Sequence, residues 1–441
     1  MMILLRVVHM LGRGRSRTER ARARLIAAGA AVATWFLFGA AEVLTLRGQF
    51  DSGWGPIANP GTRPGTAFAF GLMILPIAVF LYQTGRLASA DRERRLAALR
   101  LAGATPAEVR LLGVLETTRS AALGTVCGAT AYVVLEWSVL GLLFHPAAAG
   151  GVPPALGLAA IALVIAVAAV SGLLAGRQVI ASPLSVARRA ARRPPGRYVL
   201  LASVLGCAIV IAVVGGVPLP YDASPPLLVA VLFAVALMLS ASRLVWLSAR
   251  FAGRRARSAE TLLAARALEA DARPWGRTVS VLALAVAIGS GIGWFQAGLM
   301  DERHTLDSFW LASFTLIDLA LFVTMAVAAA ALLVHQAEYL LEHGPVLATL
   351  RATGVADGEL RRILARQAVI ATVLPCSVAA LLGLLSLATP PGELNNGAWA
   401  LWPVTNAVLM VALGVLAATF ITRASQRRLQ RAVSPGQLRT E

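Results

Sequence analysis

The sequence contains no lysine: all 40 of its basic residues are arginine. A phosphate-binding P-loop and a Schiff-base mechanism both require lysine, so neither chemistry can belong to this chain. Charged residues are scarce, at 14% of 441 residues, whereas soluble domains carry about a quarter. The three cysteines, Cys127, Cys207 and Cys376, lie inside apolar runs at spacings that suit neither a disulfide framework nor a metal site. We interpret them as buried core residues.

Most residues of the chain are apolar. They make up 58% of the chain, and the mean hydropathy is +0.72. A helix needs about 20 predominantly apolar residues to cross a bilayer. The sequence therefore predicts an all-α polytopic membrane protein with ten transmembrane helices, at residues 25–46, 66–87, 120–144, 154–175, 198–217, 226–247, 278–299, 313–335, 368–388 and 398–421.

The arginines predict the orientation of these spans. Thirty-seven of the 40 lie in the two tails and in the loops after the second, fourth, sixth and eighth spans, and only Arg47, Arg63 and Arg303 lie on the other side. Because basic loops stay in the cytoplasm, both termini are predicted to be cytoplasmic, in a bacterial cytoplasmic membrane. Arginines in short loops between apolar runs favour membrane lipids, and not nucleic acid, as their partner. Trp246 and Trp275, near inner span ends, are predicted interfacial anchors.

A short phrase occurs twice in the chain. Residues 99–110, LRLAGATPAEVR, and residues 350–361, LRATGVADGELR, share five of twelve positions at an offset of 251. Each phrase follows the second span of a four-span block, and two spans separate the blocks, which keeps the blocks parallel. The domain prediction is therefore a basic cytoplasmic tail, a first four-helix block, a two-helix spacer, and a second four-helix block with a cytoplasmic tail, at residues 1–24, 25–197, 198–247 and 248–441.

The first phrase predicts a helix, a sharp corner and a second helix. Apolar residues at helical spacing indicate a short amphipathic helix over residues 91–102. Gly103 can end it in a left-handed conformation. Thr105 suits the N-cap of the next helix, Pro106 its first turn, and Glu108 lies three residues after the cap, as a capping box requires.

The second phrase keeps this order with different residues. Leu347 and Leu350 continue the apolar stripe, and Gly354 is expected to break the helix. Asp357 is the expected cap, and Glu359 falls in the first turn of the following helix. Two short helices at equivalent places favour docking into a symmetric partner over a surface helix that simply lies on the lipid.

Residues 96–116, LAALRLAGATPAEVRLLGVLE, closely resemble the signature of the FtsX-like ABC transporter permeases. In that family a Leu-Arg-x-x-Gly-Ala-Thr phrase follows the second span. Residues 262–289 also resemble the family's usual entry, in which an amphipathic cytoplasmic helix and a basic turn precede a first span. The second phrase departs from the pattern, with Val355-Ala356 in place of Ala104-Thr105 and Gln367 at the position of Glu116.

The resemblance implies two parallel FtsX-like repeats in a membrane subunit that lacks catalytic residues. Its cytoplasmic coupling helices would engage a separate ABC ATPase, a dimer that would carry the ATP and Mg. ATP hydrolysis there would drive export or mechanical work at the outer face of the membrane. The residues implied in coupling are Arg95, Leu96, Leu99, Arg100, Gly103, Thr105, Glu108, Leu347, Leu350, Arg351, Gly354 and Glu359.

Two other functions remain open from the sequence. A secondary transporter with parallel repeats would need no ATPase, but it predicts broken helices around a central polar site, and the spans contain few central polar residues. A non-transporting regulator of an extracytoplasmic enzyme would form a stable complex at the outer face.

A few further polar residues are candidate sites. Glu136 and Asp318 fall inside spans, where charged side chains usually face a cavity or a partner. Their positions near the outer ends favour a polar interface over a proton relay. Four residues at the inner end of the eighth span lack the full ligand spacing of a metal centre: His335, Glu338, Glu342 and His343.

Overall fold

The computed structural model describes residues 17–47, 55–86, 103–135, 151–181, 225–303, 308–386 and 401–424. Every regular element in these ranges is a helix, and they contain no strand. Eight stretches within them are long and apolar enough to cross a membrane. The protein is therefore an all-α polytopic membrane protein, as the sequence predicts.

The eight candidate spans correspond to eight of the ten predicted ones. The predicted fifth span, 198–217, lies outside the described residues. The predicted third span is described only as far as Leu135. The chain divides into two compact units: unit 1 comprises residues 1–188 with 308–316, and unit 2 comprises residues 189–307 with 317–441.

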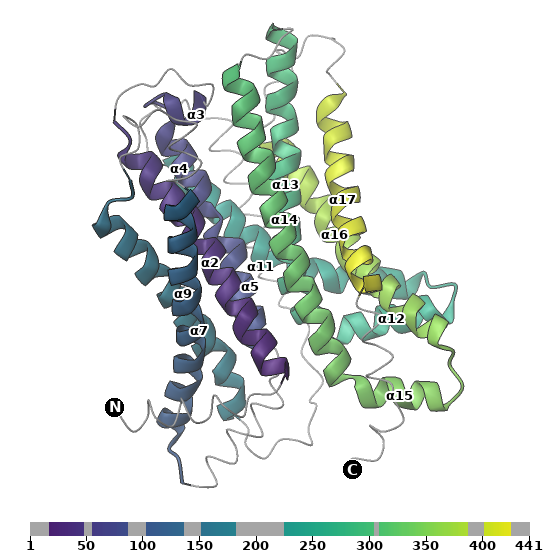
Figure 1. Ribbon diagram of the computed structural model, residues 1–441. Coiled ribbons are helices and arrows are strands. Elements are labelled where there is room, and N and C mark those ends of the chain that lie inside the picture. Colours follow the sequence, from purple (N-terminus) through teal and green to yellow (C-terminus); the bar gives the residue numbers. More distant parts are fainter. Residues whose placement is uncertain are drawn as a thin grey trace. The chain divides into compact units, whose positions relative to one another are not determined.

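Unit 1 is a bundle centred on its first long helix, α2 (Figure 1). Helix α2 packs against α4, α5, α7 and α9. A Cβ added at Gly124 of α7 would lie 2.1 Å from the carbonyl oxygen of Ala27 on α2, so only glycine permits this approach of the two backbones. The helices are α2 (Arg17–Thr45), α3 (Gly55–Ala58), α4 (Arg63–Leu72), α5 (Ile74–Arg86), α7 (Pro106–Leu135) and α9 (Pro154–Ala181).

The second predicted span, residues 66–87, is present as the candidate span Arg63–Gly85, but its helix is interrupted at one residue. Helix α4 ends at Leu72, Met73 forms a turn, and α5 begins at Ile74. Pro76 explains the break, because it has no N–H to donate to the carbonyl of Leu72 and its ring crowds that carbonyl. The corresponding helix of the second block, α14 (Ser308–Glu342), runs unbroken for 35 residues; its residues up to Leu316 belong to unit 1 and the rest to unit 2.

Unit 2 has a core of three helices, α13, α16 and α17, in which every pair is in contact (Figure 1). A Cβ at Gly383 of α16 would lie 2.1 Å from the carbonyl oxygen of Ala287 on α13, so these two backbones also touch. The remaining helices are α11 (Pro225–Arg254), α12 (Ala259–Ala270) and α15 (Gly344–Ala352), and the core helices are α13 (Ala272–Arg303), α16 (Asp357–Ser386) and α17 (Trp402–Ala424).

The two units use the same pairs of helices. In unit 1, α2, α7 and α9 all contact one another, as α13, α16 and α17 do in unit 2. Helices α7 and α16 each have 30 residues, and their first residues, Pro106 and Asp357, are separated by the offset of the repeated phrase. Helix α11 continues across the domain boundary predicted between residues 247 and 248, and it packs on α13 and α16.

Three predicted side-chain environments are wrong. Trp275 is 1% exposed and lies edge-on to His335, and Trp246 is 9% exposed beneath the guanidinium groups of Arg243 and Arg250. Both tryptophans therefore pack inside unit 2 and are not free interfacial anchors. Cys127 is exposed on α7, whereas Cys376 is buried as expected.

Candidate functional site

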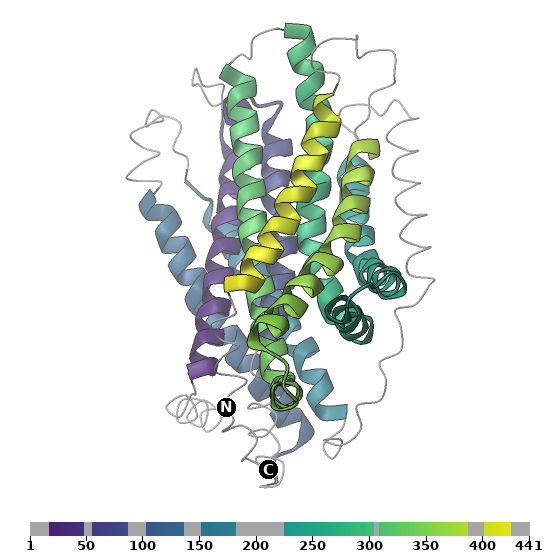
Figure 2. The same cartoon turned by 90° about the vertical axis from the view of Figure 1, so that its right-hand side faces the viewer.

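The second phrase forms a short helix set across the end of unit 2. Helix α14 ends at Glu342, His343 makes the corner, and α15 begins at Gly344. The backbone N–H of His343 donates to Tyr339, and its carbonyl accepts from Leu347, so one residue joins the two helices. Pro345 prevents α14 from continuing. Helix α15 runs across the direction of α14 in Figure 1 and is seen nearly end-on in Figure 2.

Gly354 makes the corner at the other end of α15. Its φ of +98° lies in the left-handed region that glycine tolerates best. The N–H of Val355 donates to the carbonyl of Leu350 at 3.1 Å, and the N–H of Gly354 donates to Arg351 at 3.0 Å. These two bonds define a Schellman motif. The predicted break at Gly354 is confirmed.

Apolar side chains fix α15 to the unit beneath it. Leu347 is 8% exposed and packs in a cluster with Leu340 of α14 and Leu360 of α16. Leu350 and Val355 pack against the same cluster. The stripe predicted from Leu347 and Leu350 is therefore turned inward, while Val346 and Thr349 are exposed on the other side of α15.

Gly103 makes the equivalent corner in unit 1, with the same φ of +98°. The amphipathic helix predicted before it, residues 91–102 with Arg95, Leu96, Leu99 and Arg100, lies outside the described residues. Helix α7 begins at Pro106 as predicted. The N–H of Thr105 donates to the Glu108 carboxylate at 2.8 Å, and the N–H of Glu108 donates to the Thr105 hydroxyl at 3.3 Å. The predicted capping box is confirmed.

The start of α16 is different. Ala356, at the position of Thr105, occupies the N-cap, since its carbonyl accepts from the N–H of Leu360. The prediction of Asp357 as the cap is wrong by one residue: Asp357 is the first helical residue. Its carboxylate lies 3.3 Å from Nε of Arg351, so an ion pair spans this elbow where unit 1 has a capping box. Glu359 lies in the first turn as expected, where its charge is favourable.

A comparison with protein families identifies part of this architecture. Residues 67–184 match the family model "FtsX-like permease C-terminal". The chain contains an FtsX-like permease domain. The match spans α4 to α9 and includes the Gly103 elbow. A comparison with curated proteins finds no match.

The FtsX-like domain and the eight candidate spans support a membrane permease of an ABC-type system. The match ends before unit 2, so that unit's likeness to an FtsX-like domain rests on the repeated phrase, the shared helix pairs and the second elbow. A third-span residue differs between the units. Glu116 of the FtsX-like domain lies 4.0 Å from buried Arg22, whereas Gln367 donates to the hydroxyl of Tyr339 at 3.3 Å.

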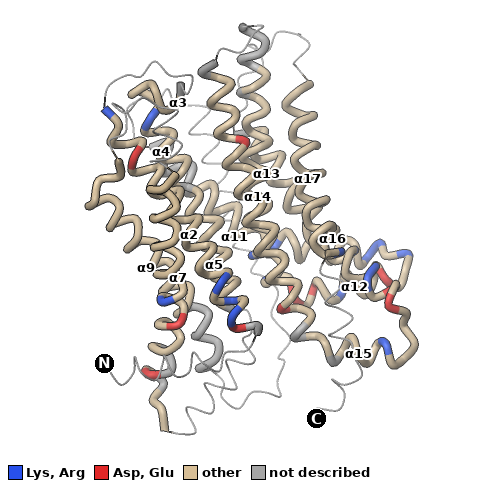
Figure 3. The backbone as a smooth tube through the Cα atoms, viewed as in Figure 1, with Lys and Arg blue, Asp and Glu red and all other residues tan. Residues whose placement is uncertain are grey.

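Acidic residues that the sequence analysis missed hold the elbow region of unit 2 together. Glu260 of α12 accepts from Arg362 at 3.0 Å and from Arg366 at 2.9 Å, both on α16. Asp271, which follows α12, lies 3.3 Å from Nε2 of His343 at the corner before α15. Figure 3 shows the charged residues gathered around α12, α15 and the start of α16. In the sequence, the signal for these ion pairs was the presence of acidic residues inside an arginine-rich stretch.

The remaining candidates are not assembled into a site. Asp318 lies on an exposed face of α14, and Glu136 lies outside the described residues. No group of His, Cys, Asp and Glu suited to a metal ion occurs in the described part of the chain. His335 contacts Trp275 and His343 contacts Asp271, so each belongs to the packing of unit 2.

Proposed function

We propose that this chain is the membrane subunit of an ABC transporter in a bacterial cytoplasmic membrane, with both termini in the cytoplasm. A separate ATPase dimer would bind ATP and Mg, since the chain has no lysine for a P-loop. Helix α15 would be one coupling helix, and residues 91–102 the other. Unit 2 would then be a second FtsX-like block, parallel to the first.

The placement of α15 carries this proposal. Both of its ends are corners, and it lies across the helices at the arginine-rich end of unit 2 (Figures 1 and 3). Its inner face is anchored through Leu347, while its outer face presents Val346 and Thr349. A short helix held at both ends and open along one side suits insertion into a groove of a partner.

The contacts of α15 give a route for motion. A movement of the ATPase that displaces α15 would act on α14 through the His343 corner and on α16 through the Gly354 elbow. Helix α12 would move with them, because Glu260 pairs with α16 and Asp271 pairs with His343. Unit 2 would respond as one body, which favours transmission of force to the outer face for export or for work on a substrate there.

Co-purification with an ABC ATPase encoded by a neighbouring gene tests the proposal. Val346→Asp places a charge on the outer face of α15 without touching its anchoring side, and we expect it to reduce ATPase association at least tenfold. Leu401→Asp is the matched control, because Leu401 is an exposed apolar residue beside α17 at the other end of unit 2. Equal ATPase association of both variants and the parent chain would refute the coupling role of α15.

A further inference from the structure

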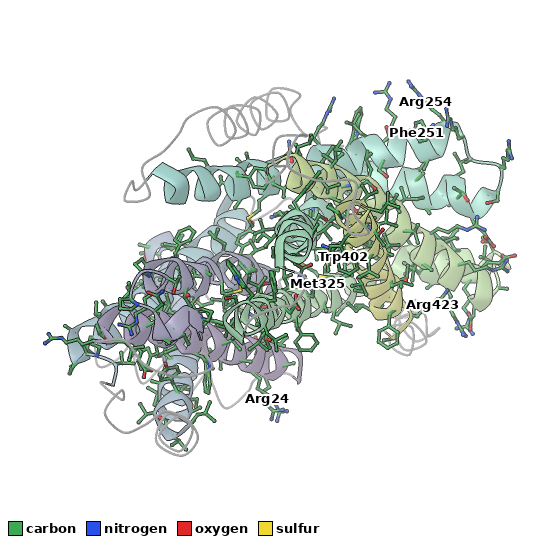
Figure 4. All side chains as sticks on the ribbon, turned by 90° about the horizontal axis from the view of Figure 1, so that it is seen from above. Arg24, Phe251, Arg254, Met325, Trp402 and Arg423 are labelled. Carbon is green, nitrogen blue, oxygen red and sulfur yellow. The ribbon has the colours of Figure 1, made fainter. Side chains whose placement is uncertain are left out.

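The end of α11 and the outer face of α12 form one surface that is both basic and apolar. Four arginines are exposed at the end of α11 and in the turn that follows it: Arg250, Arg254, Arg255 and Arg257. Phe251 is 57% exposed beside them, and Leu262 and Leu263 of α12 are 42% and 47% exposed. We name these seven residues the basic–apolar surface. Figure 4 shows Phe251 and Arg254 at the outer edge of unit 2.

Chain connectivity places this surface at the level of the lipid headgroups. A candidate span of α11 ends at Arg254, and the span of α13 begins at Ala272. Only a short turn and Asp271 separate α12 from these two spans, so α12 cannot leave the membrane surface. In Figure 2, α12 and the last turns of α11 are seen nearly end-on beside the upright α16 and α17. In a membrane crossed by these spans, α12 would therefore run along the membrane plane.

The acidic residues of α12 do not neutralise the surface. Glu260 is turned inward, with its side chain 17% exposed, and is held by Arg362 and Arg366 of α16. Glu269 pairs with Arg266 at 2.9 Å. Among the described residues, none of the four arginines of the surface has an acidic partner. The guanidinium of Arg255 lies 4.2 Å from the ring centre of Phe251, which keeps a cation beside an exposed apolar group.

We propose that the basic–apolar surface binds anionic phospholipid on the arginine-rich side of the membrane. The arginines would contact the headgroup phosphates, and Phe251, Leu262 and Leu263 would enter the acyl layer. An amphipathic helix with basic and bulky apolar residues binds an anionic interface in this way. The inward turn of Glu260 is what this occupant requires, because an outward carboxylate would repel the headgroups. The proposal depends on the membrane position alone, and not on the coupling role of α15.

Lipid-resolved quenching at position 263 tests the proposal. A bimane label is attached to Leu263→Cys in a background with Cys127→Ala, Cys207→Ala and Cys376→Ala. The protein is placed in phosphatidylcholine nanodiscs that contain an equal fraction of either brominated phosphatidylglycerol or brominated phosphatidylcholine. One arginine–headgroup contact enriches an anionic lipid on the order of fivefold, so phosphatidylglycerol should quench several-fold more strongly.

Two further variants make the outcome specific. The triple change Arg254→Gln, Arg255→Gln, Arg257→Gln should remove the excess quenching by phosphatidylglycerol and keep the quenching by phosphatidylcholine. A label at Leu416→Cys, an exposed position on α17, should be quenched equally by both lipids. Equal quenching at position 263 would overturn the anionic preference. No quenching there by either lipid would show that protein, and not lipid, covers the surface.

Discussion

Gly103 and Gly354 adopt the same left-handed backbone conformation, with φ of +98° at both, although 251 residues separate them. Nothing lies within 4 Å of a Cβ placed on either glycine. Backbone conformation alone, and not crowding, therefore restricts these positions to glycine. Each is followed three residues later by the start of a 30-residue helix, so the same corner precedes the third span of each four-span block.

Replacing Gly354 should destabilise the protein through backbone strain. Gly354→Val is expected to lower the free energy of unfolding by about 1–2 kcal/mol, the cost of forcing a side chain into the left-handed region. Thermal unfolding in detergent measures this change. Gly354→Asn is the control, because asparagine tolerates that region, and it should cost clearly less. Equal losses in the two variants would argue against conformational strain as the cause.

The two elbows predict opposite effects of exchanging their cap residues. Thr105→Ala removes the hydroxyl of the capping box and should cost about 1 kcal/mol. Ala356→Thr places a threonine three residues before Glu359, recreates the box in unit 2, and should gain a comparable amount. Thermal unfolding of the two single variants measures both effects. A loss of stability in Ala356→Thr would show that the elbow of unit 2 cannot accept a threonine cap.

The capping box also carries a pH dependence. The hydrogen bond from the backbone N–H of Thr105, and then the bond from its hydroxyl, hold the pKa of Glu108 below its usual 4.5. Because the folded-state pKa is the lower one, the carboxylate stabilises the fold above its unfolded-state pKa, and this contribution is lost as pH falls through the folded-state pKa. Glu108→Gln should therefore be less thermally stable than the parent chain at pH 7. Near pH 3 the two proteins should be closer in thermal stability.

The ion pairs of Glu260 should matter more than an exposed pair on the same helix. Glu260→Ala removes two ion pairs between α12 and α16, to Arg362 and Arg366, and is expected to cost about 1 kcal/mol because both arginines are partly exposed. Glu269→Ala breaks the exposed pair with Arg266 one turn apart and should cost at most about 0.5 kcal/mol. Thermal unfolding of both variants compares the two. Similar small losses would show that α12 is held by its apolar face alone.

Glycine-to-alanine changes in α16 should have opposite signs at its two ends. Gly383→Ala forces a methyl group against the carbonyl oxygen of Ala287, 2.1 Å away, and overpacking of this kind costs about 1–3 kcal/mol or more. Gly358→Ala meets nothing within 4 Å and should gain about 0.5–1 kcal/mol, because alanine loses less freedom in a helix. Thermal stability measured in the same detergent separates the two cases.

Local features of the elbows were predictable from the sequence, and contacts between distant elements were not. The Gly103 corner and the Thr105–Glu108 box depend on residues at most five apart, whose chemistry specifies the geometry. Arg366 pairs with Glu260 across about a hundred residues, and any of several arginines could have been its partner. Asp357 fits both a cap and an ion pair with Arg351, and only the positions of the two side chains decide between them.

The hydropathy pattern also hid one break. Residues 67–81 contain no charged residue, so the pattern predicted an uninterrupted span, although Pro76 was visible in the sequence. A proline inside a span ends or kinks the helix according to how its neighbours replace the missing hydrogen bond. Sequence alone does not give those neighbours. In the structure, the interruption is confined to Met73, whose φ of −61° and ψ of −16° stay in the helical region.

The interruption at Met73 gives the two corresponding spans different bending stiffness. Helix α14 is continuous over 35 residues, so its backbone hydrogen bonds resist bending along its whole length. Between α4 and α5 the regular hydrogen bonding is broken for one residue beside Pro76, and bending of a helix concentrates at such a place. A force along the membrane normal should therefore bend the span of residues 63–85 more than it bends α14.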